Sequence, residues 1–254
     1  MKSSVFSILL IIFTIFFVIS CSSSGANGIA EKPKQQPNIE KSKEPESIPG
    51  VLLSFDDYNP VTWEKHFYLF EKYGAKVTFF VTGKSVTKFM LNAQKRGHEI
   101  GYHTINHPNL SKVSKTVFFT QTISRKDAFK RGGIELTSFA YPYGSYNSWM
   151  NRELLKHYKI VRGFNGFNIY SKDELKSGFV NSASIDNYFF DTDKSFKENI
   201  DKMIKLAKRT GMIICFTTHG ISDKVWGITP QRLEYVLEEC KKNGLTFYRY
   251  KDFQ

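Results

Sequence analysis

Cysteine and long apolar runs are both scarce in this sequence of 254 residues. Three cysteines are too few for a small domain held together by disulfides. Cys215 and Cys240 lie in apolar patterns typical of buried free thiols, although a disulfide between them stays open. The longest apolar run, residues 5–20, is shorter than the roughly 20 residues that a membrane-spanning helix needs. Arginine-rich runs and nucleic-acid-binding motifs are missing, so we expect no nucleic-acid partner.

Apolar residues, in contrast, make up 41% of the chain and aromatic residues 15%. This composition supports a substantial core and excludes wholesale disorder or a collagen-like chain. The formal charge is +12, of which Lys2 supplies +1 while the charges of residues 22–49 cancel, which leaves +11 for the remainder. Such an excess of positive charge favours anionic surroundings, such as acidic wall polymers or lipid head groups. The alternative is that these lysines simply form a solvated face.

The N-terminus has the pattern of a secretory signal, because Lys2 precedes the apolar run and a small residue ends it just before Cys21. The segment resembles a bacterial lipoprotein signal, which implies cleavage before Cys21 and a diacylglyceryl group on its thiol. An ordinary secretory signal with an incidental cysteine is the alternative. We therefore expect a signal over residues 1–20, a lipidated cysteine with a disordered linker over 21–49, and one folded domain over 50–254. Either signal takes the protein out of the cytoplasm, and a lipid would hold it on a membrane facing the periplasm or the cell surface.

Short β-branched and aromatic runs alternate with helical periodicity from Gly50 onward, as in βα units. A helix is clearest after Thr229-Pro230, and Gly244 should close it. The expected strands cover residues 51–55, 76–81, 99–103, 138–141, 160–163, 179–184, 212–217 and 245–250. Six to eight such units predict an α/β fold, a distorted or incomplete (β/α) barrel in a single domain. An open doubly wound sheet is the alternative.

Polar residues stand where two of these strands end, and such ends carry the chemistry of barrels. The first strand runs into Asp56 and Asp57, which can share one mouth if the backbone already turns there. Capping or loop aspartates are the alternative. The third strand ends in His103 and His107, whose rings would lie on one side if the stretch formed a helical turn. Two imidazoles with a carboxylate are a usual divalent-metal site.

Two further strand ends complete a recognisable series: Phe139-Ala140-Tyr141-Pro142-Tyr143-Gly144 and Thr217-Thr218-His219-Gly220. In this order, the aspartate pair, His-x-x-x-His, the Pro-Tyr-Gly turn and the late histidine resemble the motifs of polysaccharide deacetylases, carbohydrate esterase family four. The resemblance covers about residues 50–253.

The resemblance implies a role for each matching residue. Asp56 is the general base, whereas Asp57, His103 and His107 bind one metal ion, most often zinc. The ligand types also suit cobalt, nickel, manganese or iron.

The same resemblance assigns the remaining catalytic parts. The backbone N–H of Tyr143 helps to hold the oxyanion, His219 is the general acid, and Asp186 tunes that acid. The tryptophan that commonly accompanies this aspartate is absent, and Ala140 replaces the family's arginine. Arg162 at the next strand end is a candidate replacement, although a surface position is more typical of arginine.

Three aromatic residues near the strand ends, Tyr58, Tyr141 and Trp226, are candidates for stacking on sugar rings. Tyr58 stands where the family often has glycine, which would narrow or line the groove.

Three functions compete on these grounds. The favoured one is a metal-dependent hydrolase that removes N-acetyl groups from an amino-sugar polysaccharide such as peptidoglycan or poly-N-acetylglucosamine. The second is a hydrolase of another amide, an imide or an O-acetyl ester, because a fold and a metal do not fix the substrate. The third is a glycan-binding surface lipoprotein without turnover, suggested by Ala140. The sequence fixes neither the polymer nor the oligomeric state.

Overall fold

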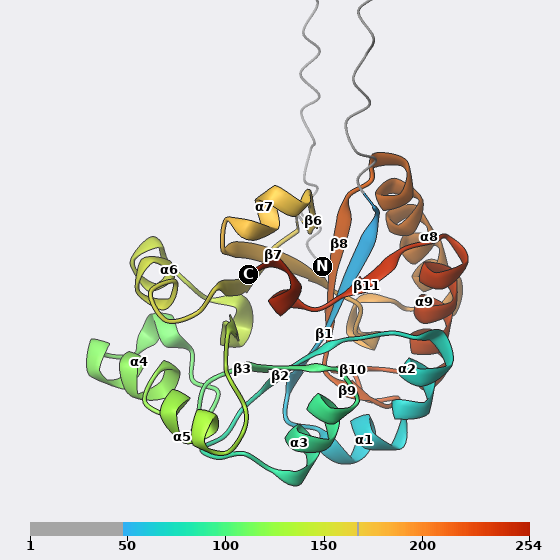
Figure 1. Cartoon of the computed structure of the whole chain (residues 1–254). Coiled ribbons are helices and arrows are strands. Elements are labelled where there is room, and N and C mark those ends of the chain that lie inside the picture. Colours follow the sequence, from blue (N-terminus) through green and yellow to red (C-terminus); the bar gives the residue numbers. More distant parts are fainter. Residues whose placement is uncertain (1–47, 167) are drawn as a thin grey trace, which may run out of the picture. The chain divides into compact units, whose positions relative to one another are not determined.

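The computed structural model describes residues 48–166 and 168–254, so Cys21 and the expected signal and linker lie outside the described residues. Within the described part, seven parallel strands close into a barrel because β1 pairs with β2 on one side and with β8 on the other (Figure 1). This closure confirms the expected (β/α) barrel and rules out the open sheet. The strands of the ring are β1 (Gly50–Asp57), β2 (Thr78–Val81), β3 (Glu99–Tyr102), β4 (Ser138–Ala140), β5 (Ile160–Phe164), β7 (Phe179–Ser184) and β8 (Ile213–Thr218).

Two short strands lie outside the ring, at its amino-terminal end. Strand β11 (Thr246–Tyr248) pairs with the first half of β1, whereas β2 pairs only with the second half. Strand β6 (Ile169–Tyr170) runs antiparallel along the start of β8. The last strand expected from the sequence is therefore real, but it widens the base of the barrel instead of completing an eighth unit of the ring.

Alternation along the strands separates an interior from an exterior. On β1, Leu52 points into the barrel, whereas Val51 and Phe55 pack outward against the helices. Tyr250 and Phe253 fill the base from the C-terminal turn η4 (Tyr250–Phe253). These rings close the barrel at its base together with the buried Glu99, whose carboxylate accepts hydrogen bonds from Thr78 and Ser138.

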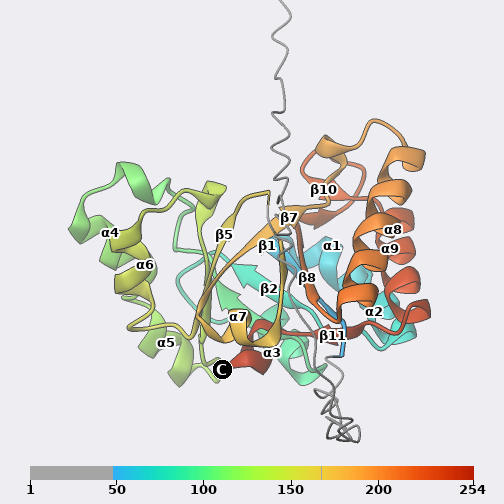
Figure 2. The same ribbon diagram turned by 90° about the horizontal axis from the view of Figure 1, so that it is seen from above.

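Helices surround the strands, with α4 and α6 on one side and α8 and α9 on the opposite side (Figure 2). In chain order they are α1 (Pro60–Lys65), α2 (Phe67–Tyr73), α3 (Lys88–Lys95), α4 (Lys115–Thr122), α5 (Lys126–Arg131), α6 (Ser148–Leu154), α7 (Lys172–Lys176), α8 (Asp193–Thr210) and α9 (Pro230–Lys242). The small elements of the mouth loops are η1 (Leu110–Lys112), η2 (Pro142–Gly144), η3 (Asn187–Phe189), β9 (Gly220–Ile221) and β10 (Gly227–Ile228). No helix in residues 48–166 or 168–254 is long and apolar enough to cross a membrane.

The last helix forms as the sequence predicts. The Thr229 hydroxyl accepts a hydrogen bond from the backbone N–H of Arg232, and Gly244 leaves the helix with φ 76°. Cys240 on its inner face and Cys215 on β8 are both buried and free, so the alternative of a disulfide between them is wrong.

Candidate active site

A cavity of about 460 Å³ opens at the carboxyl ends of the strands. Its lining brings together residues from all four motifs of the sequence, from β5, from the end of β7 with the loop after it, and from the segment between β9 and β10. They are Asp56, Asp57, His103, His107, Tyr141, Tyr143, Gly144, Arg162, Phe164, Ser184, Asp186, Phe189, Thr217, His219 and Trp226. Only Tyr58, of the site residues expected within the domain, is missing from this lining.

Asp57, His103 and His107 form a compact group of metal-ligating atoms. Oδ1 of Asp57 lies 3.6 Å from Nε2 of His103 and 3.3 Å from Nε2 of His107. This oxygen is buried and has no hydrogen-bond partner among the described residues, which is costly unless something else satisfies it. A divalent cation between the three side chains would do so.

His103 is prepared for such a cation by its surroundings. Its Nδ1 donates a hydrogen bond to the carbonyl oxygen of Ala140 at 2.8 Å, so the lone pair of the neutral ring is on Nε2. Burial lowers the pKa of His103 to about 4, which keeps the imidazole neutral at physiological pH. The donor set of two imidazoles and one carboxylate therefore fits a divalent metal ion.

The backbone of the site is unusual. Among the described non-glycine residues, the ones with positive φ are Asp57, Thr104, His107 and Tyr143, with values from 56° to 75°. Each such residue costs of the order of 1–3 kcal/mol, and such residues cluster at functional sites. The stretch from His103 to His107 is a loop, not the helical turn considered from the sequence, and the positive φ at Thr104 and His107 helps to bring the two rings within 4.9 Å.

Asp56 points into the barrel, where Nη2 of Arg162 contacts both of its carboxylate oxygens. Arg162 is only 1% exposed, so its interpretation as a surface residue is wrong. Burial alone would raise the pKa of Asp56, but the charge of Arg162 and the nearby imidazoles hold it below the usual value. Asp56 is therefore an ionised carboxylate in a fixed orientation.

His219 is held by Asp186, the partner that the resemblance implies. Nδ1 of His219 donates to Oδ2 of Asp186 at 2.8 Å, and its backbone N–H donates to Oδ1 at 3.2 Å. The hydroxyls of Ser184 and Thr218 also donate to this fully buried carboxylate. Trp63 fixes the backbone from behind by donating its indole N–H to the carbonyl oxygen of His219.

This arrangement sets the charge of His219. Burial by itself lowers the pKa, yet the hydrogen bond and the charge of Asp186 raise the pKa of His219 to about 9. At neutral pH the ring is accordingly an imidazolium. Its Nε2–H has no acceptor in the described chain and can be given to a bound molecule.

Tyr143 also lines the cavity, on the turn η2. Its ring is 68% exposed and lies 4.6 Å from that of His107. No acceptor in residues 48–166 or 168–254 takes its backbone N–H, which is therefore available to an incoming oxygen.

The three aromatic residues proposed for sugar stacking have different surroundings. Trp226 is 55% exposed on the cavity wall, with its ring stacked on Tyr188 at 4.8 Å. Tyr141 is almost fully buried with its hydroxyl bonded to Asn151, so its ring is not available for stacking. Tyr58 bonds Thr87 outside the cavity and likewise does not line it.

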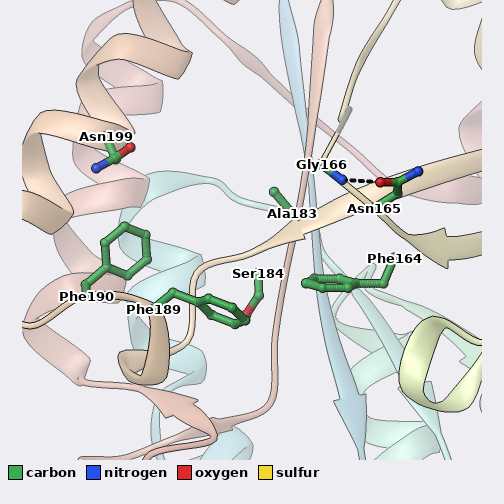
Figure 3. A pocket seen from close by; sticks show the side chains of 8 residues that line it. All are labelled: Phe164, Asn165, Gly166, Ala183, Ser184, Phe189, Phe190 and Asn199. Carbon is green, nitrogen blue, oxygen red and sulfur yellow. Dashed lines mark hydrogen bonds between the residues drawn. The ribbon is translucent and has the colours of Figure 1, made fainter. Parts of the chain in front are cut away.

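A second cavity of about 530 Å³ adjoins the first and shares Phe164, Ser184 and Phe189 with it. Figure 3 shows the two phenyl rings on either side of the Ser184 side chain. Neither phenylalanine is among the site residues expected from the sequence. The run Tyr188-Phe189-Phe190 was the one available signal, because such a polar-poor run in a loop is unusual on a solvated surface.

Part of the sequence is similar to known proteins. A family model described as polysaccharide deacetylase matches residues 43–160. The chain is similar to a peptidoglycan-N-acetylglucosamine deacetylase of Bacillus cereus, 35% identical over 104 residues that cover 37% of this chain and 36% of the relative. It is also similar to the peptidoglycan-N-acetylmuramic acid deacetylase PdaC of Bacillus subtilis, 29% identical over 136 residues, or 50% of this chain and 29% of the relative. The chain thus spans about a third of the length of these curated relatives.

Solved structures give the same result for the fold. Peptidoglycan deacetylase PdaC from Bacillus subtilis matches with a TM-score of 0.60 and 18% identity, covering 83% of this chain and 92% of that chain. The chitin deacetylase from the fungal pathogen Colletotrichum lindemuthianum matches with a TM-score of 0.60 and 17% identity, covering 82% and 88%. The chain is thus similar to polysaccharide deacetylases in sequence over part of its length and in fold over most of it.

Proposed function

We propose that the protein is a metal-dependent hydrolase that removes N-acetyl groups from an amino-sugar polysaccharide, such as peptidoglycan or poly-N-acetylglucosamine. The observation that carries the proposal is a pair of opposite catalytic charges around one cavity. Asp56 is ionised and His219 is protonated at the same neutral pH. Amide hydrolysis needs both a base for water and an acid for the departing amine.

Asp57, His103 and His107 would hold one divalent ion, which we expect to be zinc. When bound, this ion supplies a Lewis acid that polarises the acetamide carbonyl. His103 is fixed for this task by its hydrogen bond to the Ala140 carbonyl.

The other residues move protons and hold charge. Asp56, oriented by Arg162, takes the proton of the attacking water. The Tyr143 N–H donates to the developing oxyanion. His219 then gives its Nε2 proton to the amine, and Asp186 stabilises the imidazolium until that transfer.

A polymeric substrate is supported by the second cavity. The two cavities share a wall of Phe164 and Phe189, and both rings are partly exposed. A sugar next to the acetylated one would fit against these rings, and Trp226 offers a third surface for stacking. A small amide, an imide or an O-acetyl ester would leave the second cavity unused.

The test is acetate release from N-acetylglucosamine oligomers, compared with small amides and O-acetylated glycans, with and without a chelator. We expect release from the oligomers, increasing with their length and abolished by chelation. Asp56→Asn is the matched inactive control. Faster turnover of small amides than of the oligomers would favour a small amide as the substrate. Glycan binding without acetate release from any substrate would favour a glycan-binding lipoprotein without turnover.

We further propose that the mature chain is exported and held on a membrane by a lipid on Cys21. The relatives are named for action on peptidoglycan, which supports a role outside the cytoplasm. Mass spectrometry of the membrane fraction should find the lipid on the wild type and none on Cys21→Ser. A lipidated Cys21→Ser chain would contradict the proposed anchor.

A further inference from the structure

We propose that the base of the barrel, the end opposite the active cavity, is a docking surface for a membrane rich in anionic phospholipids. The base is defined here as the last turn of each helix that precedes a strand, the link to that strand, and the C-terminal segment. These stretches are residues 70–77, 92–98, 128–137, 151–159, 173–178, 207–212, 239–245 and 249–254. The surface involves no residue of the active cavity.

The base holds most of the net positive charge of the molecule. Its stretches contain 16 Lys and Arg residues against seven Asp and Glu residues, a net charge of +9. The folded part as a whole carries +11. The excess noticed in the sequence is therefore concentrated at one end of the barrel.

The mouth is different. Its loops, residues 82–87, 103–114, 141–147, 165–166, 185–192 and 219–229, contain three lysines against three aspartates. Asp56 and Asp57 at the end of β1 add two negative charges. The protein is thus polarised along the barrel axis, with its positive end facing away from the cavity.

Two observations show that stabilisation of helix ends does not account for all of the positive charge at the base. Cations in the last turn of a helix do interact favourably with the helix dipole. Lys76 and Lys159, however, lie beyond the helix ends, in the links to β2 and β5. In addition, Lys95, Lys159 and Lys208 are exposed and form no ion pair within the described residues, so their charges are open to a partner.

The position at which the chain enters the barrel favours a membrane as the partner of this basic surface. Residues 48 and 49 reach the barrel at its base, where the Pro49 carbonyl accepts from Thr246 and the Gly50 N–H donates to the carbonyl of Met212. Only 27 residues lie between Cys21 and Pro49, a reach of roughly 30 Å if they form a flexible coil. A lipid on Cys21 would hold this basic end near the head groups, and the cavity would face outward.

The experiment measures intrinsic affinity without the lipid. The chain lacking residues 1–20 and carrying Cys21→Ser retains the whole core, which lies between residues 51 and 253. Cosedimentation compares vesicles of phosphatidylcholine alone with vesicles that also contain phosphatidylglycerol. A base variant, Lys95→Gln, Lys159→Gln and Lys208→Gln, is matched with a mouth variant that neutralises the same number of exposed lysines at positions 84, 112 and 224.

We expect binding only to the anionic vesicles, weakened by salt. The base variant should lose at least about tenfold in affinity, because each lysine near an anionic surface contributes about fivefold. The mouth variant should stay within about twofold of the parent. Equal losses in both variants would show that net charge alone acts, and would overturn the docking surface. Absence of anionic-vesicle binding, or binding only to soluble polyglycerol phosphate, would overturn the membrane as its occupant.

Discussion

Replacement of Asp186 by asparagine is the sharpest test of the charge on His219. Asp186→Asn removes the charge that raises the pKa of His219 to about 9, while it keeps an oxygen that can accept from Nδ1. Without that charge the pKa should fall to 6.5 or lower, since burial of the ring then acts with less opposition. The protonated acid needed for amine departure would be lost at a lower pH.

The magnitude follows from the fraction of His219 that is protonated. With a pKa of about 9, about nine-tenths of the ring carries the proton at pH 8, and with a pKa near 6.5 only about 3% does. The rate of the variant relative to the wild type should thus fall about 30-fold at pH 8 but less than about twofold at pH 6. The alkaline limb of the pH profile should move to lower pH by about 2.5 pH units.

The assay is acetate release from N-acetylglucosamine oligomers between pH 5 and 10, with both proteins carrying the same metal. The charge of the metal affects His219 equally in both proteins. The difference between the two pH profiles therefore measures the effect of the Asp186 charge on the pKa of His219. An NMR titration of the His219 ring gives the pKa independently. A loss of equal size at every pH would mean that Asp186 acts through geometry and not through charge, and an unmoved alkaline limb would refute the assignment of His219 as the acid.

Three further outcomes follow from the site. His103→Ala or His107→Ala should each lose the one divalent ion per chain that mass spectrometry of the wild type should find, because each removes a ligand; unchanged metal content in both would disprove the site. Asp56→Asn and His219→Ala should keep the metal and each lose about 10²- to 10⁴-fold in amide turnover. An activated ester, whose leaving group needs little protonation, should rescue only the histidine variant, and equal defects on both substrates would exclude His219 as the acid. Tyr143→Ala keeps the backbone N–H and should therefore lose much less than the 10²- to 10³-fold that removal of an oxyanion donor costs; a loss of that size would assign the role to the phenol ring.

The strands of the ring and the order of the strand-end motifs could be predicted from the sequence, because the periodicity of apolar residues and the turn residues are local signals. It was not sufficient for β6, since a two-residue strand leaves no period to detect. It also could not place Phe164 and Phe189 on one wall, because Phe164 ends β5 and Phe189 lies in the loop after β7, and the two meet only when the barrel closes. Contacts between distant strand ends depend on register, which a single sequence does not encode locally.

Arg162 shows how register decides function. In the ladder between β4 and β5, Ala140 is the direct partner of Arg162, and both side chains face the barrel interior. The guanidinium that the family pattern would place at position 140 is thus supplied from the adjacent strand at the same level, and the small alanine leaves room for it. Arg162→Ala alone should lower the free energy of unfolding by about 3–5 kcal/mol, because it leaves Asp56 as an unpaired buried charge. Combining Arg162→Ala with Ala140→Arg should restore much of the unfolding free energy in urea and much of the acetate release, since the pair is re-formed from the neighbouring strand. If the double variant is no better than Arg162→Ala in either measurement, the two positions are not equivalent, and Arg162 holds Asp56 in a way that only β5 can provide.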